Sequence, residues 1–151
     1  MKQTAAAIVT VLVLALLAST ISTGGATMAS WNVPQLPQAF WGYVWLDGAP
    51  APSGTVIVGK AENVRLPAYG NPFVITKAGE LGGKGGFSPK LVVQGDFRRV
   101  GGAGPILVGS PVTFFVEGSE EPLWVYDIED GVWTKSVPFE AGGVGYVYLV
   151  R

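Results

Sequence analysis

Two sets of side chains alternate along residues 39–46, which read AFWGYVWL. Successive side chains of a β-strand point to opposite sides of the sheet, so this stretch is predicted to form a strand. One set suits a protein core and consists of Phe40, Gly42, Val44 and Leu46. The other set falls on the opposite side, where a lone domain normally shows polar residues, and consists of Trp41, Tyr43 and Trp45. We call this second set the aromatic stripe.

The strand is predicted to end at a turn and to be followed by a second strand. Asp47-Gly48 is a turn signal, and Pro50 and Pro52 keep the connection extended. The β-branched run Thr55–Val58 then suits a strand that pairs with the first. The sequence therefore predicts a hairpin at the start of the domain.

Short strand patterns separated by glycine and proline continue to the end of the chain, with no helical period after residue 22. Asp130-Gly131 predicts a hairpin turn, and the glycine-rich stretch 79–86 predicts a flexible loop. The expected later strands are 73–76, 91–94, 112–117, 123–128, 132–137 and 145–150. This pattern predicts an all-β fold, a single antiparallel β-sandwich over residues 39–151.

The first 38 residues differ in character from the rest. Lys2 precedes the uncharged apolar run Ile8–Leu17, and Thr27-Met28-Ala29 fits a cleavage site, so residues 1–29 are interpreted as a signal peptide. A retained hydrophobic leader helix that anchors the chain is the alternative. Both place the domain outside the cell, at the cell surface.

Residues 30–38, SWNVPQLPQ, form an extended linker or an arm that adds to the sheet edge of a neighbour. The segment carries two prolines and no charge, which favours an extended chain. An idle tether has no need of its three large apolar side chains, Trp31, Val33 and Leu36. The alternative of an arm rests on these three residues.

Composition removes several functional classes. The chain has no cysteine and no histidine, which excludes Ser-His and Cys-His catalysis and Cys/His zinc sites within this chain alone. Its net charge of −1 provides no basic field for nucleic acid. Lys84 lies among glycines, but Gly85 follows it, so the spacing of a phosphate-binding loop fails.

The opening stretch resembles a known module. Phe40-Trp41-Gly42, Leu46-Asp47-Gly48 and the run 49–55, APAPSGT, are similar to carboxypeptidase-regulatory-like modules of exported archaeal and bacterial proteins. Residues 86–93 and 109–118 resemble later strands of the same module. The resemblance implies an Ig-like or transthyretin-like sandwich in a surface protein, mostly without catalysis, and it implies no binding site.

Two groups of side chains are candidates for function. Acidic residues gather near the predicted turn after residue 128 and suit Ca²⁺ chemically, but no EF-hand spacing is present, so no cofactor is expected. A contiguous apolar patch on a protein surface usually marks a site where something else binds, so we expect another group to cover the aromatic stripe. Three covers remain open: the chain's own segment 61–70 or C-terminal hairpin, another subunit, or a stacked sugar.

These observations predict a non-catalytic extracellular structural protein that assembles with itself into a filament or sheath. The predicted interface residues are Trp31, Val33, Leu36, Trp41, Tyr43 and Trp45. The alternative is a module that binds surface polysaccharide or an envelope protein. Neither function needs an enzyme's residues, a metal or nucleic acid.

Overall fold

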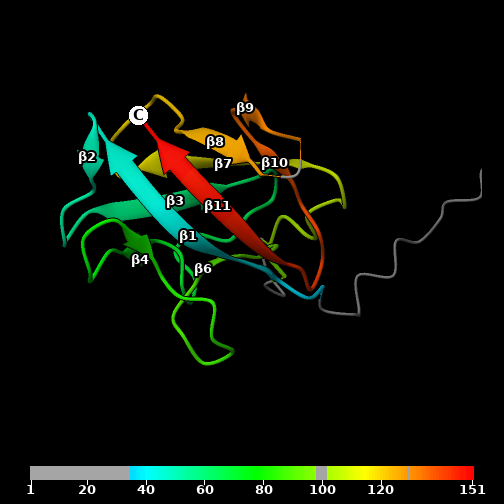
Figure 1. The fold of residues 1–151 in the computed structure, drawn as a ribbon. Helices are drawn as coiled ribbons and strands as arrows, with labels where there is room; N and C mark the ends of the chain where they lie inside the picture. Colours follow the sequence, from blue (N-terminus) through cyan, green and yellow to red (C-terminus); the bar gives the residue numbers. More distant parts are fainter. Residues whose placement is uncertain (1–34, 98–101, 129) are drawn as a thin grey trace, which may run out of the picture. The chain divides into compact units, whose positions relative to one another are not determined.

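The computed structural model describes residues 35–97, 102–128 and 130–151, and in this part of the chain every regular element is a strand. Figure 1 shows the strands as two facing groups. The buried core lies wholly within one compact unit, Trp31–Arg151, so this unit carries its own folding determinants. The predicted leader lies outside the described residues.

The strands form a seven-stranded sheet and a four-stranded sheet. The larger sheet contains β1 (Gln38–Leu46), β2 (Ala49–Pro50), β5 (Glu80–Leu81), β6 (Leu91–Val93), β8 (Trp124–Asp127), β9 (Val132–Thr134) and β11 (Val144–Val150). The smaller contains β10 (Val137–Pro138), β7 (Pro111–Val116), β3 (Val56–Lys60) and β4 (Phe73–Val74), in that spatial order. The all-β, two-sheet prediction is confirmed.

The inner faces of the two sheets enclose one hydrophobic core. Phe40 of the larger sheet meets Phe114 of the smaller sheet edge to face, with ring centroids 5.1 Å apart. Val44 is fully buried, and Phe40 is 1% exposed, as the alternation in residues 39–46 predicts. Burying large apolar side chains contributes roughly 1.5–3 kcal/mol each, so this core is the main source of stability.

The first and last strands of the domain lie side by side and run in parallel, β1 against β11, from Ala39↔Val144 to Trp45↔Val150 (Figure 1). This parallel pair departs from the fully antiparallel sandwich that the sequence predicts. Gly42 makes the close approach possible, because a Cβ at this position would lie 1.9 Å from the carbonyl oxygen of Val147. Its φ of +147° is also one that residues with side chains rarely adopt.

The predicted opening hairpin is wrong in its pairing. The strand that follows the turn exists as β3, but it belongs to the other sheet, while β1 pairs with only two residues of β2. Ala51 is fully buried between these elements, and its N–H donates to Val44 O at 2.9 Å. Pro50 and Pro52, on either side of Ala51, have no N–H to donate, so they interrupt the hydrogen bonds along β1. The chain therefore passes to the other sheet instead of folding back along β1.

Two further predictions concern a hairpin and a loop, and only the first is confirmed in full. The hairpin of β8 and β9 is confirmed, with Tyr126 opposite Trp133. The stretch 79–86 is not wholly a loop, because it begins with β5, whose fully buried Leu81 pairs with Gly42. Two-residue strands such as β5 carry no periodic pattern, so only the neighbouring strand defines them.

A buried amide links the loop before β4 to β3 of the smaller sheet. Asn71 is fully buried, and its side chain accepts the Gly59 N–H at 3.1 Å and donates to Gly59 O at 2.8 Å. The amide therefore satisfies both backbone groups of Gly59, as a paired strand would. This arrangement anchors the loop before β4 against the middle of β3.

Replacing Gly42 with alanine is expected to destabilise the domain by at least about 3 kcal/mol, because the new Cβ collides with the Val147 backbone and the φ is strained. Gly48→Ala is the matched control. It has φ +81° but open space around it, and should cost about 1–2 kcal/mol. Urea unfolding of the three proteins measures both changes. Equal losses would contradict the steric role of Gly42.

Candidate functional site: an aromatic sheet face

The outer face of the larger sheet carries aromatic side chains on four adjacent strands. The strand registers place Tyr43, Tyr148, Tyr126 and Trp133 in one row across β1, β11, β8 and β9. Trp41 and Tyr146 form the row on one side, and Trp45, Val150 and Trp124 form the row on the other. We call the eight aromatic residues of these rows the aromatic face: Trp41, Tyr43, Trp45, Trp124, Tyr126, Trp133, Tyr146 and Tyr148.

Neighbouring rings of this face meet at steep angles. Trp41 contacts Tyr146 with centroids 4.8 Å apart and planes at 70°, and Tyr126 contacts Trp133 at 5.0 Å and 51°. Longer contacts join Tyr43 to Tyr146 and Trp133 to Tyr148 at 6.4 and 6.3 Å. The two contacts of Tyr146 are edge to face, and the two contacts of Trp133 are tilted. Because the ring planes are inclined to one another, the surface is ridged and not flat.

The sequence leaves three possible covers for the aromatic stripe, and the structure argues against one of them, a cover from the chain itself. The C-terminal hairpin and β11 lie beside the aromatic stripe as strands of the same sheet, so they extend the face and do not cover it. Segment 61–70 instead reaches the end of β6, where Arg65 N–H donates to Gln94 O at 2.9 Å. Tyr43, Trp124 and Trp133 stay 43–49% exposed. Within the described residues, the face has no intramolecular cover.

A shallow apolar hollow of about 350 Å³ lies at one edge of the face, between Trp124, Trp133 and Val150. Lys135 borders it, with Nζ 4.0 Å from the centre of the Trp124 ring, and donates to Pro122 O at 3.0 Å. The cation–π contact and the hydrogen bond hold both side chains in place. The sequence identified the five tryptophans but gave no sign that Trp124 and Trp133 share a surface with the stripe.

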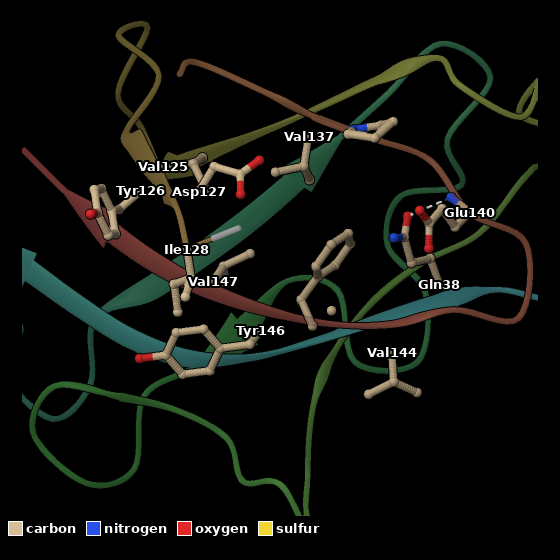
Figure 2. A pocket seen from close by; sticks show the side chains of 13 residues that line it. Gln38, Val125, Tyr126, Asp127, Ile128, Val137, Glu140, Val144, Tyr146 and Val147 are labelled. Carbon is tan, nitrogen blue, oxygen red and sulfur yellow. Dashed lines mark hydrogen bonds between the residues drawn. The ribbon is translucent and has the colours of Figure 1, made fainter. Parts of the chain in front are cut away.

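A second cavity, of about 440 Å³, opens where β8 diverges from β11 (Figure 2). Its lining mixes apolar groups with Asp127, Glu140 and Gln38, and Gln38 Oε1 accepts the Glu140 N–H at 3.0 Å. In Figure 2 the Asp127 side chain extends toward Val137. We call this cavity the wedge. Nothing in the sequence predicted it, because it depends on where two strands stop pairing.

The end of the arm is fixed to its own domain. The Gln35 side chain donates to Ile106 O at 2.6 Å and accepts the Ile106 N–H at 3.0 Å, while Pro37 O accepts the Gly142 N–H at 3.1 Å. Leu36, one of the predicted interface residues, is 67% exposed. The other two arm residues, Trp31 and Val33, lie outside the described residues.

Acidic side chains do not gather into a metal site: within residues 35–97, 102–128 and 130–151, no three of them come close enough to share an ion. Asp127 Oδ1 instead accepts the Asp130 N–H at 3.2 Å, which closes the turn. Glu129 lies outside the described residues.

In the described part of the chain, no helix is long and apolar enough to span a bilayer.

Comparison of the chain with protein-family models, with curated proteins and with solved structures gives no match. The resemblance to carboxypeptidase-regulatory-like modules therefore remains a prediction. In the part of the chain that the structure describes, the fold is a two-sheet β-domain, and no other segment covers its aromatic face.

The ionisation of Tyr146 offers a test of how closely the aromatic face is packed. Burial raises the pKa of Tyr146 above 10.0, and the neighbouring Tyr43 and Tyr148 raise it further. The native protein thus holds this proton more tightly than the unfolded chain does. The contribution of Tyr146 to the free energy of unfolding is therefore fully present below pH 10, and it is lost as the pH rises through the pKa of Tyr146 in the native protein. Tyr146→Phe should flatten this decline in melting temperature, measured between about pH 9 and 11.5. Tyr69→Phe, at an exposed tyrosine, is the control, and equal slopes in the two variants would contradict the packing.

Proposed function

We propose that this protein is an exported, non-catalytic structural subunit that assembles with itself at the cell surface, and that the aromatic face is a contact surface. One observation carries the proposal: eight aromatic side chains occupy the outside of one sheet with no cover among the described residues. Contiguous exposed apolar surface of this kind is typical of interaction sites.

The composition of the face favours a protein partner. Trp and Tyr are the side chains most enriched at the energetic centres of protein interfaces. Charged groups stand at the margin, with Lys135 beside Trp124 and Glu80 opposite Tyr43. An apolar centre with a polar rim is the usual anatomy of an interface. The steep angles between the rings suit interdigitation with another ridged surface better than stacking on a flat ligand.

The extracellular setting rests on the sequence. An apolar leader precedes the domain, and the chain has no cysteine, so its stability outside the cell depends on the core and not on disulfides. A subunit that assembles through a sheet face needs no catalytic group. Contacts between unlike surfaces of successive copies do not have to close into a ring, and they then produce filaments.

Trp133→Glu is the direct test of this assembly. For the chain of residues 30–151, we expect light scattering to detect large species of the wild type. The variant should associate roughly 30-fold more weakly, the effect of losing one large aromatic contact. Phe87→Glu is the matched control, since Phe87 is a fully exposed aromatic residue outside the face. A wild type that stays monomeric at all concentrations would overturn the proposal, as would equal effects of the two changes.

A second function, binding of surface polysaccharide, is favoured by the hollow between Trp124, Trp133 and Val150. Its two half-exposed indoles and its apolar lining suit the apolar face of a sugar ring. If this site binds glycan, cell-envelope polysaccharide should change the tryptophan fluorescence of residues 30–151, and Trp124→Ala should abolish the change. No change at saturating polysaccharide would rule this function out.

A further inference from the structure

The larger sheet has an open edge at the wedge. Ala39 N–H donates to Gly143 O, Asp47 N–H donates to Arg151 O, and Arg151 N–H donates to Trp45 O, at 3.0–3.1 Å. Because backbone groups alternate in direction along a strand, the odd-numbered residues of β11 bond to β1. The even-numbered residues then direct their N–H and C=O groups toward β8.

Pairing with β8 covers only part of this edge. The even-numbered Tyr148 and Val150 pair with Tyr126 and Trp124, and the register ends there. Val144 and Tyr146 lie beyond it, and among the described residues no strand pairs with their N–H and C=O groups. Both residues line the wedge. Unpaired strand edges are templates for another strand.

The aromatic face alone is small for a stable assembly. It spans four strands about 4.8 Å apart and five residues of β1, Trp41 to Trp45, at about 3.3 Å each, or roughly 300 Å² in projection. A stable interface buries about 800 Å² on each partner. A second contact beside the face would add to the buried area, and the wedge lies directly beside Tyr146, at the border of the face. The exposed Val144 and Ile128 flank it, at 62% and 59% exposure.

We propose that the wedge receives the N-terminal segment 31–34 of a second copy as an added antiparallel strand on β11. This inference rests on the proposed self-assembly and names the segment that completes the contact. The described chain begins at Gln35, whose side chain is bonded to Ile106, so the segment has a fixed base on its own domain. Residues 35–37 contain no turn.

The two prolines explain why the partner is another copy. The residue before a proline disfavours the helical conformation, so the sequence favours extended conformations at Val33 and Leu36, which precede Pro34 and Pro37. Next to a base that is fixed at Gln35, this sequence preference disfavours reversal onto the chain's own β11. It favours projection toward a neighbour, and repetition of this contact links copies head to tail.

Chemistry sets the orientation of the added strand. Pro34 has no N–H, so Trp31 and Val33 must direct their backbone groups toward β11. Directly opposed residues of an antiparallel pair share a face, so Trp31 lies opposite Tyr146 and Val33 opposite Val144. Trp31 thereby extends the aromatic face. Asn32 points into the wedge, toward the polar lining of Gln38 and Glu140.

Disulfide trapping tests this register, because the chain has no native cysteine. In residues 30–151, the double variant Val33→Cys/Val144→Cys should form a ladder of covalent multimers on a non-reducing gel after mild oxidation. The control pair is Val33→Cys/Val74→Cys, since Val74 is a half-exposed residue of β4 in the other sheet. It should leave free thiols.

Three results would overturn the inference. Disulfides confined to single chains would show that the segment binds its own domain. Free thiols in the test pair would show that it does not bind β11, and equal ladders in both pairs would show unspecific collision.

A backbone variant separates this inference from the proposed function. Val144→Pro removes an N–H that no strand of its own sheet uses, so the domain should keep its fold while association falls roughly tenfold. Val144→Thr keeps the N–H and should associate normally. Assembly that resists Val144→Pro but is lost in Trp133→Glu would end the strand inference and leave the proposed function standing. A wild type without assembly or trapping would end both.

Discussion

The parallel pairing of β1 with β11 is the contact on which the rest of the domain depends. It joins the first strand to the last over seven residue pairs, and it requires the bare backbone of Gly42 against Val147. Three short strands, β2, β5 and β6, complete the other edge of β1. Because the pairing joins residues about a hundred positions apart, forming it costs the conformational entropy of closing a long loop.

The same pairing creates the aromatic face. The outward residues of β1 are only a stripe of three until β11 adds Tyr146 and Tyr148 in register, and the β8–β9 hairpin adds Trp124, Tyr126 and Trp133. Inside the sheet, the same strands contribute Phe40, Val147 and Leu149 to the core. One sheet thus serves two apolar surfaces. The core stabilises the domain, and the other surface is the one that we propose as a contact with a partner.

The open edge at the wedge has a comparable origin. β8 follows β11 only as far as Tyr148, because the chain then turns at Asp127 to form β9. The β11 backbone at Val144 and Tyr146 is left beside a cavity and next to exposed aromatic rings. A sheet face provides apolar contact area but does not fix the orientation of a partner. The hydrogen bonds of a strand edge fix the orientation of an added strand but bury little area. Together they supply what a specific, repeating contact needs.

How much of this was predictable depends on the range of the interactions. Alternation in residues 39–46 settled which side chains of the first strand face the core, and Asp130-Gly131 settled the last hairpin, because both are local backbone properties. The absence of cysteine and histidine also limited the available chemistry from the sequence alone. Only the tertiary structure decided that β3 leaves β1 for the other sheet, that β11 takes its place in parallel, and that Trp124 and Trp133 join the stripe. Those outcomes depend on contacts between residues far apart in the chain, and no local pattern encodes them.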